Sequence, residues 1–405
     1  HRLIDILDLR QPDEPTTVLI GPYEHHSNEL PWRECNVELE VIPLDEQGAL
    51  DLNVLQQRLV ALAGQRRIYA SFSAASNVTG LRTDTGKVSA LVHRYGGRVF
   101  WDYAAAAPYV GIDVSNKDAV FISPHKFPGG PGTPGLLVLR RDLYLRATPS
   151  RPGGGTVSFV SPRGHTYVDD CERREEAGTP GIIESIRAGL VFKLQQQVGT
   201  DRIEAREEAL RQRALARWGK HPRIKLLGNP ELPSLSILSF QITDGERPYH
   251  YAFIVAALND LFGIQARGGC SCAGPYGHHL LHLNQASSRA LERDILNGHS
   301  VMRPGWVRMN FNYFLADDSV EYLLSAVELI ADHCEALLPH YRYHAASGSW
   351  RYQGESIPLP VSLQDCDLGA MHAAPGERAE LPLAHYLAEA ESVLRCCGAA
   401  PTGPA

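Results

Sequence analysis

The sequence predicts an α/β fold, with a mostly parallel sheet in a large first domain and a smaller α/β domain after it. Between residues 17 and 140, short apolar runs alternate with helical patterns, which is typical of a parallel sheet covered by helices on both faces. Farther along, the alternating run Trp306–Phe314 precedes a helical pattern over Ser319–Leu338, which indicates a second α/β unit. We place the first domain at residues 1–200, the second at 201–343 and an extension at 344–405.

Each element of the first domain has its own signal. Asp51 is the expected cap of a helix that ends near Ala63, and Asp84 or Thr85 caps another that stops at Gly96-Gly97. Residues 147–182 are rich in glycine, proline and serine and predict a long functional loop, followed by one long helix over 183–218. Apolar runs predict strands at Val18–Ile20, Leu39–Leu44, Arg67–Phe72, Arg98–Asp102, Ala119–Ser123 and Leu136–Leu139.

The second domain and the extension carry fewer signals. A strand is predicted at Ser236–Gln241. In the extension only Leu381–Leu394 has a helical pattern, and the closing residues predict disorder. In the strand Trp306–Phe314, one face is expected to be apolar and the other polar, with Val307, Met309, Phe311 and Tyr313 on the first and Arg308, Asn310 and Asn312 on the second.

Composition excludes several classes of function. The formal charge of −7 and the pI of about 6.2 argue against a nucleic-acid partner, because no basic surplus is present to neutralise phosphates. No apolar run approaches the roughly 20 residues of a membrane span. The eight cysteines are scattered through the chain, which predicts reduced thiols and a cytoplasmic protein. Cys270-x-Cys272 has no second cysteine pair with ligand spacing, so no metal site is expected.

The strongest chemical signal lies in residues 99–135. Asp102 ends one predicted strand, and Lys126 follows the next strand in Ser-Pro-His-Lys, before a glycine-rich run. Because the carboxyl ends of parallel strands open on the same edge, the two side chains can meet one ligand. Pyridoxal phosphate requires this pair: a lysine forms an imine (Schiff base) with its aldehyde, and a carboxylate keeps the pyridine nitrogen protonated. Alone, such an aspartate is usually a cap and such a lysine is usually solvated.

Several further segments resemble those of the class V aminotransferases, in particular the cysteine desulfurase and selenocysteine lyase branch. The resemblance covers about residues 1 to 340. It implies the pyridoxal-phosphate-dependent transferase fold of type I. The matching segments are Glu24-His25-His26-Ser27-Asn28 with Pro31-Trp32, Ser76-Asn77-Val78-Thr79-Gly80, Ser123-Pro124-His125-Lys126, Glu176-Ala177-Gly178-Thr179-Pro180, Arg267 to Pro275, and Val307-Arg308.

The resemblance also implies roles at the matching positions. His25 would stack on the cofactor ring and shuttle a proton, and Asn77 would bond the ring hydroxyl. Ser123 and His125 would bind the cofactor phosphate. Thr179 would reach the phosphate in the neighbouring subunit, which makes the site one shared across a homodimer.

Arg308 would grip the carboxylate of a small amino-acid substrate with a two-pronged pair. Each of these residues also has a structural reading of its own: a polar loop for His25, a turn for Asn77, a helix cap for Thr179 and a salt bridge for Arg308.

Cys272 decides between the candidate reactions. The resemblance implies that this thiol attacks the sulfur of a bound substrate and becomes a persulfide, which a sulfur-acceptor protein then receives. The leading hypothesis is removal of sulfur or selenium from cysteine or selenocysteine to give alanine. The first alternative is an aminotransferase, lyase or epimerase in which Cys272 is inert packing. The second alternative is a catalytically silent fragment or scaffold.

The sequence departs from the family pattern in three places. Ala105 stands where relatives carry a glutamine that contacts the cofactor ring oxygen. The run after Lys126 is longer by one residue, at Gly129-Gly130-Pro131. The chain begins at His1 with an uncapped helical pattern, so we expect that roughly ninety residues, including the small-residue phosphate loop, lie upstream.

Overall fold

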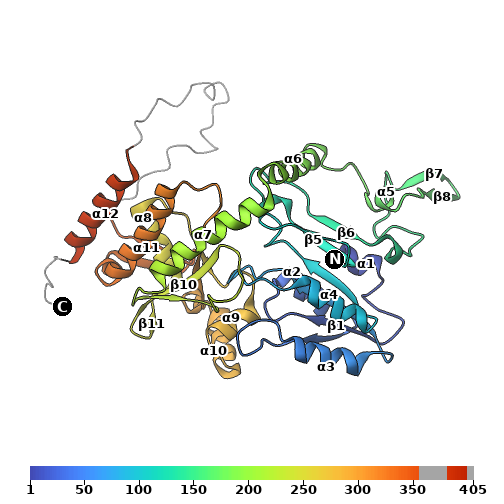
Figure 1. Ribbon diagram of the computed structural model, residues 1–405, viewed down its shortest axis with the longest axis horizontal. Coiled ribbons are helices and arrows are strands. Elements are labelled where there is room, and N and C mark those ends of the chain that lie inside the picture. The colour runs from blue at the N-terminus through green and yellow to red at the C-terminus, as the bar shows by residue number, and fades with distance from the viewer. Residues whose placement is uncertain (355–380, 399–405) are drawn as a thin grey trace, which may run out of the picture.

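The computed structural model of the chain describes residues 1–354 and 381–398. Two sheets lie side by side along the long axis, and the long helix α7 runs between them (Figure 1). The first sheet holds the amino-terminal half, and the second, smaller sheet holds the carboxyl-terminal half. The predicted α/β class is therefore confirmed. In the described residues, no helix is both long and apolar enough to cross a bilayer.

The first sheet has the order β2-β1-β3-β4-β5-β6. All neighbours in it are parallel except β5 and β6, which are antiparallel. The strand predicted at Leu39–Leu44 is shorter and begins earlier, because its later residues turn away at Pro43. The strands are β1 (Thr16–Ile20), β2 (Glu38–Val41), β3 (Arg67–Ser73), β4 (Arg98–Asp102), β5 (Ala119–Ile122) and β6 (Leu136–Leu139).

Helices cover this sheet on both faces, and a hydrophobic cluster lies under each layer. The Asp51 carboxylate caps its helix by accepting bonds from the backbone N–H groups of Asn53 and Val54. Asp84 caps the next helix through the N–H of Lys87, which settles the choice between Asp84 and Thr85. The helices are α1 (Arg2–Ile6), α2 (His26–Arg33), α3 (Leu52–Leu62) and α4 (Thr85–Arg94).

The connection to the second sheet differs from its prediction in two ways. The segment 147–182 contains a hairpin, β7 (Val157–Ser161) with β8 (Gly164–Tyr167), and the short helix α5 (Cys171–Glu175). The single helix expected over 183–218 is two helices, α6 (Ile182–Val198) and α7 (Thr200–Trp218). Gly199 divides them because its φ of 88° lies in a region that helices exclude.

The second sheet has the order β11-β10-β13-β12, with β9 paired to β10, and all its pairs are antiparallel. The strand predicted to reach Phe314 ends at Asn310, although Val307, Met309 and Phe311 are buried as expected. The elements are β9 (Ile224–Leu226), β10 (Ile237–Asp244), β11 (Arg247–Pro248), α8 (Tyr251–Phe262), β12 (Arg267–Gly269), α9 (Gly274–Leu280), α10 (Gln285–Leu296), β13 (Trp306–Asn310) and α11 (Asp317–Leu337).

The extension is partly built into this second unit. A hairpin of β14 (Tyr341–His344) and β15 (Ser349–Tyr352) follows α11, and the Trp350 indole N–H donates to His250 Nδ1 at 3.1 Å. The helix predicted at Leu381–Leu394 is α12 (Leu383–Gly398), and its Leu394 is fully buried in the core of the second unit. The disorder expected for the closing residues concerns positions outside the described residues.

Candidate active site

The predicted cofactor residues meet at one edge of the first sheet. Asp102 is the last residue of β4, and Lys126 lies in the short 3-10 helix Pro124–Lys126 that follows β5. These strands are parallel neighbours, with Asp102 opposite Phe121, so both side chains emerge on the same side of the edge. A cavity of about 450 Å³ opens there. Its lining includes His25, Asn77, Asp102, Ser123, His125 and Lys126.

The pKa values of Asp102 and Lys126 are shifted in opposite directions. Burial is the largest cause that raises the pKa of Asp102, while the N–H of Ala104 and the charge of Lys126 lower it in part. Burial also leads the lowering of the Lys126 pKa, and Arg308 and Arg267 add to it. Lys126 is exposed at the cavity mouth, so solvent moderates its shift. A lysine with a lowered pKa holds more of its amine neutral, which is the form that attacks a carbonyl carbon.

Asn77 and Arg308 bring the second unit to the cavity. An Arg308 Nη1–H donates to the backbone carbonyl of Asn77 at 2.7 Å, and the Asn77 amide donates to the carbonyl of Ser271 at 2.7 Å. Within the described residues, the buried Asn77 Oδ1 and Arg308 Nε have no hydrogen-bond partner. Unsatisfied buried polar atoms of this kind are expected where a ligand supplies the missing bonds.

The donor set fits pyridoxal phosphate. Lys126 offers an amine for the aldehyde, Asp102 a carboxylate for the ring nitrogen, and the partly unpaired Asn77 amide a group for the ring hydroxyl. Ser123 and His125 lie in the same lining, where they can meet a phosphate. Ala105 lines the cavity as well, so the departure from the family glutamine lies at the site itself.

The histidine segment is anchored by a glutamate that the sequence analysis did not single out. His25 precedes α2, and its Nδ1 accepts the N–H of Ser27, which fixes the ring at the cavity wall. Glu24, which is 3% exposed, accepts bonds from Asn28 Nδ2 and from both the N–H and the hydroxyl of Ser73. Burial raises its pKa to about 7, and the charge of Asp102 adds to that rise. The only signal in the sequence was its place before His25.

Cys272 lies close to these groups but on a different element. It stands between β12 and α9, near enough to Lys126 and Arg308 that a thiolate there would raise the pKa of each. Its side chain is half-buried, whereas Cys270 is exposed. Ser271 and Cys272 both have positive φ, at 54° and 57°, a conformation that side chains other than glycine adopt at a cost.

Thr179 does not line the cavity of its own chain. It lies exposed just before α6, away from the residues that line the site. Its expected contact, with the cofactor of a neighbouring subunit, therefore stays a prediction.

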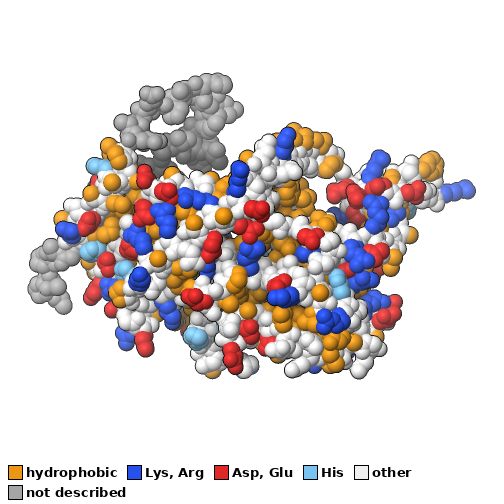
Figure 2. Space-filling view, viewed as in Figure 1, with side chains coloured by type: hydrophobic (Ala, Val, Ile, Leu, Met, Phe, Trp, Pro, Cys, Tyr) orange, Lys and Arg blue, Asp and Glu red, His pale blue; other side chains and the backbone are white. Residues whose placement is uncertain are grey.

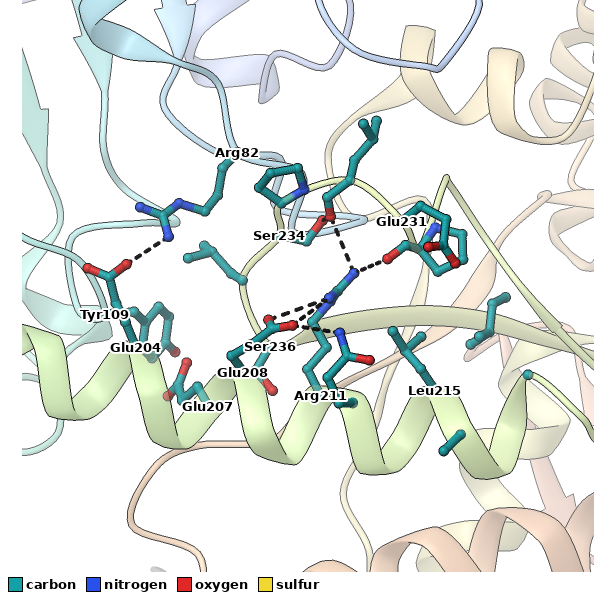
Figure 3. Close-up of a pocket in the computed structure, with 18 of the residues that line it drawn as sticks. Arg82, Tyr109, Glu204, Glu207, Glu208, Arg211, Leu215, Glu231, Ser234 and Ser236 are labelled. Carbon is teal, nitrogen blue, oxygen red and sulfur yellow. Dashed lines mark hydrogen bonds and ion pairs between the residues drawn. The ribbon is translucent and has the colours of Figure 1, made fainter.

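A second and larger cavity does not gather these residues. It measures about 800 Å³ and lies between α7 and the segment 230–236 (Figure 3). Most of its charged side chains are paired with one another: Arg82 with Glu204 at 2.7 Å, and Arg211 with Glu208 at 3.2 Å and with nearby backbone carbonyls. The chemistry therefore points to the smaller cavity.

The family model that describes class V aminotransferases matches residues 6–321. The chain belongs to the class V aminotransferase family. This match covers the first sheet, most of the cavity lining and the loop of Cys272. The family depends on pyridoxal phosphate, in agreement with the donor set of the site.

Among class V aminotransferases, the chain is similar to proteins described as cysteine desulfurases. It is 30% identical to a cysteine desulfurase of Escherichia coli over 264 residues, which are 64% of this chain and 62% of the relative. It is 32% identical to a probable cysteine desulfurase of Mycobacterium leprae over 264 residues, or 41% of that relative. The chain thus spans less than two thirds of the length of these relatives.

Solved structures agree in fold. An apo cysteine desulfurase from Thermococcus onnurineus superimposes with a TM-score of 0.67 at 25% identity, over 82% of this chain and 76% of that one. The cysteine desulfurase CsdA of Escherichia coli gives 0.65 at 23% identity, over 80% and 75%, and shows the fold alone. The predicted transferase fold of type I is confirmed.

Proposed function

We propose that this chain acts as a pyridoxal-phosphate-dependent cysteine desulfurase, which removes sulfur (or selenium) from cysteine (or selenocysteine) and leaves alanine. The observation that carries the proposal is the convergence of Lys126, Asp102 and Asn77 in one cavity with the loop of Cys272 beside it. The similarity to cysteine desulfurases supports the same reaction.

Each residue at the site would have a role that follows from its position. When bound, pyridoxal phosphate supplies a ring that accepts electrons from the substrate carbon next to the amino group. Asp102 would hold the ring nitrogen protonated, and His25 would pack on the ring face. Lys126 would hold the cofactor through its amine, and the same amine would serve as the base that takes the substrate α-proton and later returns it. Arg308 would bind the substrate carboxylate, because its Nε is free among the described residues.

Cys272 would carry the sulfur. Its thiolate attacks the substrate sulfur, so that a sulfur–sulfur bond forms and the bond between that sulfur and Cβ breaks. The electron pair leaves with the carbon, which takes a proton and becomes the methyl group of alanine. The product on the enzyme is a persulfide of Cys272, and a sulfur-acceptor protein would collect it from the exposed side of the loop.

We further propose a homodimer in the cytosol. The helix α6 exposes the apolar side chains Ile182, Ile183, Ile186, Leu190 and Leu194. Figure 2 shows hydrophobic side chains gathered along this helix, beside the segment that carries Thr179. Across the described residues the cysteines are free thiols, which supports a reducing compartment.

The first test concerns the cofactor. After incubation with pyridoxal phosphate, borohydride reduction and peptide mapping should place the reduced adduct on Lys126. A Lys126→Arg variant should show no adduct, and Lys117→Arg should leave it unchanged, because the Lys117 ammonium is tied to Asp113 and Asn116 away from the cavity. An adduct on another lysine would overturn the assignment of the site.

The second test concerns the reaction. Anaerobic incubation with cysteine should yield alanine together with a persulfide on Cys272. Cys272→Ala should lose both products, while Cys270→Ala should keep them. Full turnover by Cys272→Ala would contradict desulfuration and favour an aminotransferase, lyase or epimerase. A chain that gains no colour from the cofactor would favour a catalytically silent scaffold.

A further inference from the structure

The two adjacent histidines of the segment 24–28 face different partners. His25 lines the cofactor cavity, whereas His26 contacts the loop of Cys272. The His26 backbone N–H donates to the carbonyl of Cys272 at 2.9 Å. Its ring Nε2 accepts the backbone N–H of Gly274, also at 2.9 Å. His26 therefore holds the loop of Cys272 on both sides of Ala273.

The loop needs such support because of its backbone. Ser271 and Cys272 are consecutive residues in the left-handed region, which is unfavourable for residues other than glycine. The two bonds that His26 makes with the loop, and the one from the Asn77 amide to Ser271, hold the backbone in this conformation.

The fit between His26 and Gly274 is close. A Cβ atom at position 274 would lie 3.1 Å from His26 Nε2, which is tighter than an ordinary contact. The glycine thus lets the imidazole approach the backbone. This is a steric condition only, because Gly274 does not have a positive φ.

We propose that His26 is a positioning residue, which holds Cys272 in its left-handed conformation beside the cofactor cavity. Only the identity of Cys272 as the sulfur nucleophile rests on the proposed function. The two adjacent histidines then serve two parts of one site. His25 lies at the cofactor cavity, and His26 sets the position of the Cys272 thiol relative to that cavity. Because both histidines lie at the start of α2, we expect a substitution of one to shift the position of the other.

The geometry also defines which substitution should rescue the function. His26 Nε2 acts as an acceptor, so its replacement must offer an acceptor at similar reach. The Oε1 atom of glutamine meets this condition, whereas leucine fills the volume without an acceptor. The backbone bond to Cys272 persists in both variants. The difference between them therefore isolates the bond from Gly274.

The experiment measures the alkylation rate of each thiol with iodoacetamide, by peptide mapping, in the chain without added cofactor. We expect His26→Leu to speed alkylation of Cys272 several-fold and His26→Gln to stay within about twofold of the unchanged protein. The exposed Cys396, far from the site on α12, serves as the internal control. His165→Leu, an exposed histidine on β8, is the matched control and should change neither rate.

A second variant keeps the proposal falsifiable from the loop side. Gly274→Ala should crowd His26 and also speed the alkylation of Cys272, and its effect should not add to that of His26→Leu, because both break the same contact. Fully additive effects, or a Cys272 rate in His26→Leu equal to that of the unchanged protein, would overturn the proposal. Alkylation needs no turnover, so this failure is distinct from a failure of desulfuration.

Discussion

At the scale of single residues, positively charged side chains outnumber carboxylates around Lys126. Burial lowers the pKa of Lys126, and the charges of Arg308 and Arg267 lower it further, while the carboxylate of Asp102 opposes them. Burial and the charge of Arg267 also lower the pKa of Arg308. Such a setting suits a ligand that carries anionic groups, and both a cofactor phosphate and a substrate carboxylate are of this kind. The electrostatics and the donor set thus point to the same class of ligand.

A buried carboxyl in the larger cavity provides a prediction about pH. Glu207 is 4% exposed, accepts the N–H of Tyr313, and has a pKa that burial raises to about 8 (Figure 3). The folded chain keeps this proton at pH values where the unfolded chain has lost it. The contribution of Glu207 to stability is therefore full below about pH 4.5 and is lost as the pH rises through about 8.

Glu207→Gln should remove that loss. Glutamine retains an acceptor for Tyr313, so the variant should match the unchanged protein near pH 5 and exceed its unfolding free energy at pH 9 by on the order of 3 kcal/mol. Urea denaturation across this pH range measures the difference. Glu231→Gln, on an exposed residue of the same cavity, should show no such trend. A pH-independent difference for Glu207→Gln would contradict the prediction.

Sequence reasoning reached the residues at strand ends and missed those defined by packing. Asp102 and Lys126 were predictable because parallel strands open on one edge, whatever the loops between them do. The hydrogen bonds of Glu24 and His26 join segments that are far apart in the chain: Ser73 with Glu24, and Gly274 with His26. No local pattern encodes such partners, so only the folded chain reveals them.

At the scale of elements, short apolar runs predicted the strands of the first sheet well, whereas several elements of the second unit were missed. The helix α8 was missed because its run YAFIVAALNDLF is apolar around most of its circumference, so it lacks a clear polar face. The strand β12 was missed because Arg-Gly-Gly has no strand propensity and is held by β13. The break at Gly199 was readable in principle, since a glycine stood inside the expected helix.

The helix α12 offers a test of packing with a control one residue away. Leu394 is fully buried, whereas the neighbouring Val393 is 43% exposed. Leu394→Ala should lower the free energy of unfolding by about 2–4 kcal/mol, because a cavity opens in the core of the second unit. Val393→Ala should change it by less than about 0.5 kcal/mol. Equal effects in urea denaturation would show that α12 does not pack as described.

At the scale of the whole molecule, the two sheets are joined by α7 and by the contacts around Asn77. Arg308 on β13 and the loop after β12 both meet the turn that follows β3, so the candidate site draws on both units. The exposed apolar face of α6 lies on the first unit, outside both cores. Five exposed apolar side chains along one helix are typical of a protein–protein interface.

Ile186→Glu should therefore disrupt the proposed homodimer. A charge at the centre of the α6 face would have to be buried without a partner, so we expect monomers by sedimentation velocity where the unchanged chain is dimeric. Leu296→Glu, on an exposed leucine of α10, is the matched control and should leave the dimer intact. A monomeric unchanged chain, or a dimeric Ile186→Glu variant, would contradict the prediction.

The place of α12 has a consequence for biosynthesis. A ribosome releases the chain from its amino-terminal end, so the first sheet can form while the second unit is still being translated. The second unit cannot bury Leu394 and Ala390 until α12 has been synthesised. Its apolar interior must stay partly uncovered until then, and exposed apolar surface of this kind is what chaperones bind.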